Sequence, residues 1–378
     1  MKKIYQKIIA YRSKLVVLGM TVLLFASCKK DNDLVGSNPG VTDESALVTE
    51  ARSLEQSVPP QVNAEGSTLG FTEADRNGNR NIVQIASSNA NFSALVAAVV
   101  KTGLAGALSD ASANLTVFAP TNAAFAQLPA PFNNAANIAG ISDAGQVDFL
   151  RNVLLYHVLG AEVFYGQVAN GRSSAATIKP AGASNDNTIY LSKTFGILRI
   201  NGLSTVILPN LNASNGVIHV INKVLIFPSS TIADIAIGNP DFSTLVAALV
   251  KTNLAGVFAG SGDFTVFAPT NAAFAKLPAP FNNSTNISNI SDPAQVAALA
   301  NILTYHVTAS RYFAWDLGIL NKVTTLASGP NNKLTTLLGF NNGWVKGNKN
   351  RSFSAIAPVD LLATNGVIQV IGDVLLPE

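Results

Sequence analysis

The chain has 378 residues, of which 48% are hydrophobic and 12% are charged, and its formal net charge is +3. Five of the 25 basic residues and none of the 22 acidic residues lie before residue 28, so the rest of the chain has 20 basic and 22 acidic residues and a net charge of −2. This balance excludes the strongly basic surface that nucleic-acid-binding proteins use.

Residues 1–27 have the pattern of an export signal. Basic residues precede an apolar run over residues 15–26, which is too short to cross a bilayer because a span needs roughly 20 apolar residues. The run ends in Phe25-Ala26-Ser27-Cys28, which resembles the lipobox of bacterial lipoproteins. The resemblance implies cleavage before Cys28 and lipidation of that residue, the chain's only cysteine. We expect an outer-membrane or cell-surface lipoprotein, with the periplasmic face as an alternative location and an ordinary cleaved signal as an alternative reading.

Residues 28–80 are predicted to form the lipid anchor and a flexible tether. The segment has clusters of Gly, Pro, Asn and Asp and no sustained apolar period, apart from a short helix that we expect over residues 44–56. A random coil of this length reaches roughly 40 Å. Residues 75–79 faintly resemble a calcium loop, but Arg80 replaces the required glycine and Ala86 the closing carboxylate, so a plain turn is predicted.

The remainder of the chain repeats itself. Residues 116–134 recur at residues 265–283 with one difference, Gln127 against Lys276, and further matches follow at offsets of about 150 residues. A period this long indicates whole domains instead of a solenoid repeat of roughly 20 to 50 residues. We therefore predict two domains, at residues 81–228 and 230–378.

Each copy is predicted to be α+β, because helical patterns come first and strand patterns last. In the first copy we expect a helix with Ser93 or Asn91 as its cap, a strand over residues 115–119 ended by Pro120, and a helix capped by Thr121 or Asn122. A helix through Leu150, Val153 and Leu154 follows, and then strands over residues 205–208 and 217–226. Before the last strand, Asn215-Gly216 is expected to form a tight turn with left-handed backbone.

Three motifs, in the same order in both copies, resemble the fasciclin-like domain family. They are residues 116–125 and 265–274, the Tyr-His steps at residues 156–157 and 305–306, and the closing segment 215–225 with its counterpart from Asn365. The resemblance implies a helical layer packed on a wedge of β-strands, an extracellular location, and a role in adhesion or matrix binding without an enzyme site. Gln369 departs from the family's histidine, and Asn222 and Gly372 depart from its frequent aspartate.

The Tyr-His steps leave two interpretations open. His157 and His306 continue an apolar helix face, which favours core histidines that donate to backbone carbonyls. The family resemblance instead implies an adhesive contact region at Tyr156, His157, Tyr305 and His306. These four residues are the predicted binding site.

The other polar residues indicate structure more than chemistry. His219 is matched by Gln369, which forms hydrogen bonds but cannot replace imidazole as a metal ligand or proton carrier. With no HExxH or paired CxxC motif, we expect no metal, no cofactor and no catalytic residues. For Tyr312, Phe313 and Trp315 we expect packing of a strand, with an exposed aromatic contact as the alternative.

The leading hypothesis is therefore an adhesion or binding protein whose partners are a membrane, reached through the lipid on Cys28, and an unknown protein or polysaccharide. The alternative is a carrier or sensor of a small apolar ligand, which requires a pocket of several hundred Å³ between helices and sheet. An enzyme ranks third and would need a cleft where His157 or His306 meets a carboxylate and a serine.

Overall fold

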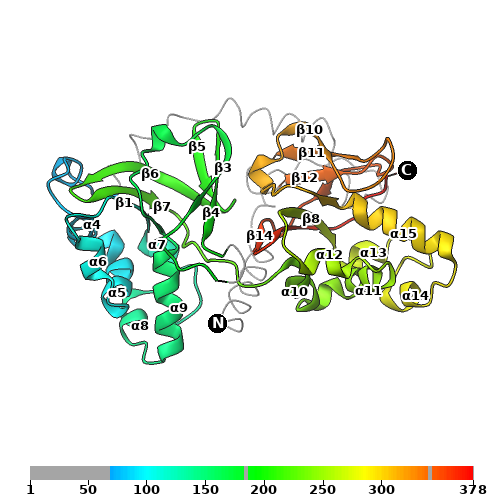
Figure 1. Cartoon of the computed structure of the whole chain (residues 1–378), viewed down its shortest axis with the longest axis horizontal. Coiled ribbons are helices and arrows are strands. Elements are labelled where there is room, and N and C mark those ends of the chain that lie inside the picture. The colour runs from blue at the N-terminus through cyan, green and yellow to red at the C-terminus, as the bar shows by residue number, and fades with distance from the viewer. Residues whose placement is uncertain (1–68, 183–185, 339–342, 378) are drawn as a thin grey trace, which may run out of the picture. The chain divides into compact units, whose positions relative to one another are not determined.

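The computed structural model describes residues 69–182, 186–338 and 343–377. The chain divides into two compact units between Ser229 and Ser230 (Figure 1). The signal-like segment, Cys28 and the helix expected over residues 44–56 lie outside the described residues. Among those described, no single helix is long and apolar enough to cross a membrane, and one bent pair, at residues 82–88 and 90–101, passes that test jointly.

The first unit begins with helices and ends with strands. Its helical elements are η2 (Glu73–Asp75), α4 (Ile82–Ser88), η3 (Ala90–Phe92), α5 (Ser93–Lys101), α6 (Ala105–Ser109), α7 (Asn122–Phe125), α8 (Ala135–Ala139), α9 (Ala144–Leu155) and η4 (Tyr165–Gln167). Its strands are β1 (Leu115–Pro120), β2 (Val158–Leu159), β3 (Gly171–Ala176), β4 (Thr188–Thr194), β5 (Ile197–Ile200), β6 (Ser204–Ala213) and β7 (Gly216–Ile221).

The seven strands form one sheet in the order β2-β1-β7-β6-β5-β4-β3. Only β1 and β7 pair in parallel, from Leu115 opposite Gly216 to Pro120 opposite Ile221. Figure 1 shows α4, α5, α6, α8 and α9 gathered on one side of the unit, and β3, β4 and β5 on the other. The predicted α+β class and helical layer are confirmed.

The second unit repeats this plan with α10 (Ile232–Ile237), η5 (Pro240–Phe242), α11 (Ser243–Lys251), α12 (Ala255–Ala259), β8 (Phe264–Pro269), α13 (Asn271–Phe274), α14 (Ser284–Ser288), α15 (Pro293–Tyr305), β9 (Val307–Thr308), η6 (Ala314–Asp316), β10 (Ile319–Thr324), β11 (Lys333–Leu338), β12 (Gly343–Lys346), β13 (Ser354–Ala355), β14 (Leu361–Ala363) and β15 (Gly366–Ile371). The strands form two four-stranded sheets, β10-β11-β12-β13 and β14-β15-β8-β9, with β8 and β15 parallel.

The two units differ where the first has the long strand β6. The backbone is left-handed at Asn210 and at Asp360, with φ 58° in both. In the first unit the ladder from β6 to β7 shifts register there and continues, whereas in the second unit the strand divides into β13 and β14. The same local distortion thus leaves one sheet continuous and splits the other.

The parallel pair is buried on both faces in the second unit. Val266 and Ile368 belong to a core cluster with the helices, while Phe267 and Ile371 belong to a second cluster with β11 and β12 residues such as Leu334 and Val345. Every residue of β7 and of β15 is buried. A strand pair covered on both faces needs apolar residues at successive positions, which explains the Val and Ile runs.

Some sequence-based expectations about local structure are confirmed. Thr121 caps α7 by accepting a hydrogen bond from the Ala124 amide at 3.2 Å, and β1 ends at Pro120. Asn91 and Ser93, however, do not cap α5. Asn89 caps the short η3 helix instead, and the side chain of Asn122 accepts from the Ala94 amide at 2.9 Å. The amides at the starts of η3 and α5 are therefore bonded to Asn89, which precedes both predicted caps, and to Asn122, which is distant in sequence.

Several strands of each unit were not expected, and the closing strand is shorter than predicted. Strands β3, β4 and β5, and their counterparts β10, β11 and β12, lie in segments for which no element was predicted. The closing strand β7 ends at Ile221 and does not continue to residue 226. The Leu225 amide donates to a histidine side chain at 2.9 Å instead of to a neighbouring strand.

The C-terminal part of the expected tether packs against the first unit. The Leu69 carbonyl accepts from the side chains of Asn89 and Asn91, and the Arg80 carbonyl accepts from the Ser214 amide. The Asp75 carboxylate, in the supposed calcium-like segment, accepts from Thr72 and pairs with Arg80 at 2.9 Å. Residues 69–80 therefore belong to the folded unit, because their backbone groups are bonded to it.

The expected left-handed turn at Asn215-Gly216 is only half correct. Gly216 has φ 145°, and a Cβ there would overlap the Leu115 backbone, whereas Asn215 is not among the residues with positive φ. The buried Asn215 side chain accepts from the Ile82 amide at 3.0 Å and donates to the carbonyls of Leu108 and Asp110. Asn365 makes the same three bonds in the second unit, to Ile232, Phe258 and Gly260.

We predict that Asn215→Asp lowers the free energy of unfolding of the first unit by roughly 2 to 4 kcal/mol, because a carboxylate would face two carbonyl oxygens and leave them without a donor. Urea unfolding followed by circular dichroism measures this loss. The matched control is Asn212→Asp, at an exposed position near the end of the preceding strand β6, for which we expect little change. Equal stability of the two variants would contradict the role assigned to Asn215.

Candidate functional site

Both Tyr-His steps lie at the end of the long helix in each unit. Helix α9 begins at Ala144, and the carboxylate of Asp143 caps it by accepting from the Gln146 amide at 2.8 Å. The apolar face of α9 is buried, and this face continues into Tyr156 and His157 just beyond the helix end. Tyr156 and Tyr305 are 0% exposed, and His157 and His306 are 2% exposed.

The two histidines are held as neutral rings by identical hydrogen bonds. In His157, Nδ1 lies 2.7 Å from the Val153 carbonyl, and Nε2 accepts from the Leu225 amide at 2.9 Å. A carbonyl only accepts and an amide only donates, so the proton is on Nδ1. His306 repeats this with the Ile302 carbonyl at 2.7 Å and the Leu375 amide at 2.8 Å. The interpretation of both residues as core histidines that donate to a backbone carbonyl is confirmed.

The two tyrosines connect the same helix end to the strands on the other side. The Tyr156 hydroxyl donates to the Thr188 carbonyl at 2.6 Å and accepts from the Asn201 side chain at 3.0 Å. The Tyr305 hydroxyl donates to the Lys333 carbonyl at 2.8 Å and accepts from the Asn348 amide at 3.1 Å. Each tyrosine therefore joins the helix end to a strand, and each histidine joins it to the segment that follows the closing strand.

Burial limits how these four residues could take part in binding. Their side chains are covered and their hydrogen-bonding atoms are engaged inside each unit. The predicted role in adhesion stays a prediction, and in this conformation it requires that the Tyr-His steps set the shape of nearby surface segments without touching a partner.

His219 and Gln369 perform the same structural task. His219 accepts from the Asn210 amide at 3.2 Å and lies 2.9 Å from the Val163 carbonyl. Gln369 accepts from the Asp360 amide at 3.0 Å and donates to the Tyr312 carbonyl at 3.1 Å. Both side chains thus hold the left-handed residue of the distorted strand, as expected from their exchange between copies.

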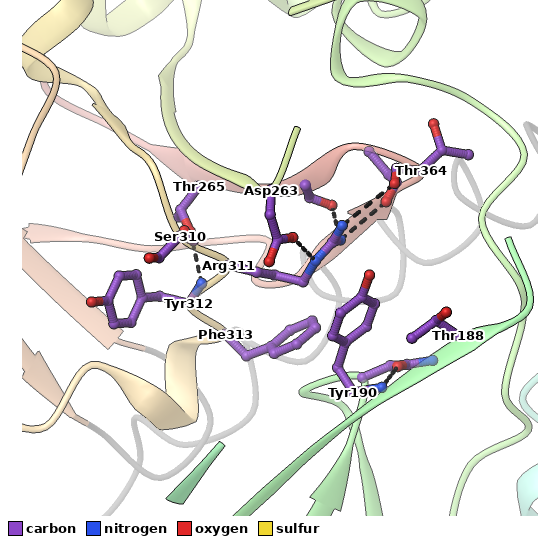
Figure 2. A network of polar contacts seen from close by, with 12 residues as sticks. Thr188, Tyr190, Asp263, Thr265, Ser310, Arg311, Tyr312, Phe313 and Thr364 are labelled. Atoms are coloured by element: carbon purple, nitrogen blue, oxygen red, sulfur yellow. Dashed lines mark hydrogen bonds and ion pairs between the residues drawn. The ribbon is translucent and has the colours of Figure 1, made fainter. Parts of the chain in front are cut away.

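The second unit contains a buried arginine network that was not predicted from the sequence. Arg311, whose side chain is 3% exposed, donates from Nε to the Asp263 carboxylate at 2.6 Å and from its terminal nitrogens to the carbonyls of Ala363, Gly366 and Thr364. Figure 2 shows the guanidinium between Asp263 and Thr364. The corresponding residue of the first copy is Glu162, and this charge reversal within a matched segment was the available signal.

The aromatic cluster after the second Tyr-His step is mostly core. Phe313 and Trp315 are buried, as expected, but they lie at the start and within the 3-10 helix η6 and not on a strand. Tyr312 is half-buried, and its amide donates to the Thr265 hydroxyl at 2.7 Å. The same hydroxyl donates to the Ser310 carbonyl at 2.6 Å, so Thr265 fixes this turn (Figure 2).

A cavity in the second unit bears on the carrier and enzyme hypotheses. It has a volume of about 20 Å³ and is lined by His306 and by apolar residues such as Phe242, Leu245 and Phe258. This is room for about one water molecule and far below the several hundred Å³ that a small ligand needs. The lining contains no carboxylate and no serine, so this cavity favours neither hypothesis. Within the described residues, no group of three or more His, Cys, Asp or Glu could hold a metal ion.

Burial lowers the pKa of His157 and of His306 from 6.5 to about 4. Between these values the unfolded chain binds more protons than the folded one, so stability is fully present above pH 6.5 and is lost as the pH falls toward 4. We predict a loss on the order of 2 to 4 kcal/mol per histidine over this window. Urea unfolding at pH 7, 5.5 and 4 measures it.

Glutamine variants separate this effect from general acid denaturation. His157→Gln and His306→Gln retain a donor and an acceptor, as Gln369 does in place of His219, but cannot titrate in this range. The double variant should show a flatter dependence of stability on pH. An unchanged slope would show that other groups cause the loss.

Comparison with known proteins follows the same division of the chain. The Fasciclin domain model matches residues 90–227 and 240–377. The uncharacterized protein sll1735 of Synechocystis sp. is 39% identical over 145 residues, which cover 38% of this chain and 96% of that protein. The transforming growth factor-beta-induced protein ig-h3 of Sus scrofa is 29% identical over 270 residues, which cover 70% of this chain and 35% of that protein. The chain thus spans about a third of the length of ig-h3.

Among solved structures, the FAS1 domain pair from the insect cell adhesion molecule Fasciclin I covers 74% of this chain and 94% of that chain, with 18% identity and a TM-score of 0.35. Since the two Fasciclin matches include every Tyr-His, Asn-Gly and Thr-Val-Phe-Ala-Pro motif described above, the chain belongs to the Fasciclin domain family and carries two tandem copies of the domain.

Proposed function

We propose that this chain is a lipid-anchored adhesion protein of the outer membrane or cell surface that binds a protein or polysaccharide through its Fasciclin domains and has no enzyme site. The observation that carries the proposal is the order of features: two Fasciclin matches follow a cysteine that ends a signal-like segment. Fasciclin domains typically serve adhesion or binding in extracellular proteins.

The use of the buried polar residues supports a binding role over a catalytic one. His157, His219 and His306 are the chain's only histidines, and each contacts backbone groups through both ring nitrogens. A general base needs a nitrogen that can reach a substrate proton, and these nitrogens are engaged inside the fold. Binding would then use the outer surface, which is rich in Asn, Ser and Thr and has few charges.

Duplication suits a ligand that is itself repeated. Two linked domains that each bind one unit of a polymer gain avidity, because the second contact forms at the high effective concentration set by the linker. Neither copy then needs high affinity of its own. A polysaccharide or a fibrous matrix protein fits this requirement.

The anchor is tested by Cys28→Ser. We predict that the variant takes up no labelled fatty acid in cells, whereas the parent chain takes it up and enters the detergent phase of a Triton X-114 partition, because a serine cannot take the thioether-linked lipid. Mass spectrometry of the N-terminal peptide identifies the modification. Ser27→Ala, which keeps a small residue before the cysteine, is the control and should remain in the detergent phase. A parent chain whose N-terminal peptide carries no lipid on Cys28 would disprove lipid anchoring through this residue.

The Tyr-His steps are tested in the soluble Cys28→Ser chain on surfaces coated with matrix proteins or with polysaccharides. We predict that Tyr156→Phe with Tyr305→Phe, and His157→Gln with His306→Gln, weaken binding about tenfold, or ~1.4 kcal/mol, because the segments they position become less ordered. His219→Gln is the control, since Gln369 holds the equivalent place in the second copy. Wild-type binding by correctly folded variants would argue against a role for these steps in adhesion.

A further inference from the structure

The outer strand of the first domain's sheet is open to another strand. Strand β3 ends the order β2-β1-β7-β6-β5-β4-β3, and within the described part of the chain the strand it pairs with is β4, with Gly171 opposite Lys193 and Ala176 opposite Thr188. Arg172, Ser174 and Ala176 are exposed, and Ser173 and Ala175 are half-buried. An edge strand of this kind presents a row of backbone amides and carbonyls on its outer side.

The hydrogen bonds of the β3 ladder show which residues face outward. The Thr177 amide donates to the Asn187 carbonyl at 2.8 Å, which makes Thr177 one of the residues bonded to the β4 side. Backbone groups alternate in an antiparallel pair, so those of Ser173 and Ala175 also point toward β4. The backbone groups of Arg172, Ser174 and Ala176 point away from it.

The matching edge of the second domain has features that hinder strand addition, and β3 lacks them. Strand β10 has a register shift between Ile319 and Asn321, a left-handed backbone at Leu320, and an exposed Lys322. Bulges and edge lysines are common means of blocking edge-to-edge pairing. Strand β3 keeps one register along its length, and its only charged residue is Arg172.

The open edge has the length of the strand itself. Just beyond it the Ile178 amide donates to the Val158 carbonyl at 2.9 Å, so the edge is closed from there on. At the other end, Gly171 has φ 85° and turns the chain. An incoming strand therefore has room for about the five residues 172–176.

We propose that this edge pairs with the β3 strand of a second copy of the chain, in an antiparallel ladder with its twofold axis at Ser174. This register places Ser174 opposite Ser174, Arg172 opposite Ala176, and Ser173 opposite Ala175. The residues with outward backbone groups then form hydrogen-bonded pairs with each other, and the side chains between them are small.

The charges also permit this pairing. The two Arg172 residues would lie at opposite ends of the new ladder, roughly 13 Å apart at about 3.3 Å per residue. That separation exceeds the Debye length of roughly 8 Å at physiological salt, so their repulsion is largely screened. One short strand pair makes a small interface, so the dimer is expected to be weak in solution and favoured where anchoring concentrates the chains.

The proposal does not depend on the identity of the adhesive ligand, and it is tested with the whole mature chain carrying Cys28→Ser. Sedimentation velocity from micromolar to submillimolar concentration should show a monomer-dimer equilibrium. Ser174→Pro should abolish the dimer and leave the monomer folded, because the lost amide faces away from β4. A chain that stays monomeric throughout, or a dimer that persists in this variant, would overturn the proposal.

Charge variants locate the twofold axis. Ser174→Lys and Ser174→Glu should each be monomeric, because like charges would face each other, and an equimolar mixture should restore a dimer. Ala107→Lys, on the exposed side of α6, makes the same charge change away from β3 and should dimerise like the parent chain. Loss of the dimer in Ala107→Lys, or no restoration in the mixture, would refute this register.

A cysteine placed at the axis tests the pairing in the anchored protein. In cells, Ser174→Cys with the native Cys28 should form a disulfide-linked dimer on mild oxidation, since residues at such a pair lie about 5.5 Å apart between Cα atoms. Ala107→Cys is the control and should remain uncrosslinked. Equal crosslinking at both positions would indicate random collision and contradict the proposed ladder.

Discussion

Each domain depends on the parallel pairing of its Thr-Val-Phe-Ala-Pro strand with its closing strand. This ladder joins Leu115 to Gly216 in the first domain and Phe264 to Gly366 in the second, so it brings together chain segments that are far apart in sequence. The two backbones approach so closely at its start that only glycine fits there. The preceding asparagine then bonds the start of one helix and the end of another, which ties the helical layer to the sheet.

The sequence predicted the parts of this fold that depend on local chemistry. The duplication, the capping by Thr121 and the strand end at Pro120 follow from residue type and spacing, and the core role of the histidines follows from helix periodicity. Strand β3 was not predicted because its Gly-Arg-Ser-Ser-Ala-Ala sequence has no apolar alternation, and its pairing with β4 supplies what the pattern lacks. Tyr156 and Arg311 donate hydrogen bonds to carbonyls that are distant in sequence, and spacing along the chain cannot predict such contacts.

Differences between the two copies show which contacts the fold requires. Gln127 donates to the Asn222 carbonyl, and Lys276 at the equivalent position donates to the Gly372 carbonyl while pairing with Asp373. The pair His219 and Gln369 behaves in the same way. In these cases the side chain differs between the two copies, but it forms a hydrogen bond with the equivalent backbone group. Arg311 is different, since Glu162 cannot replace its donors. Among the described residues, the turn before the closing strand is bound by a guanidinium in the second domain only, through the carbonyls of Ala363 and Gly366.

The bond between His157 and the Leu225 amide has a mechanical consequence. Residues 222–229 are the route by which the polypeptide leaves the first domain, and Leu225 is held there by the imidazole. Tension transmitted along the backbone from the second domain reaches this bond before it reaches the β1 and β7 ladder. Under such tension this hydrogen bond would bear load before the sheet does, and it would weaken in acid, where the ring gains a second proton and can no longer accept from the amide.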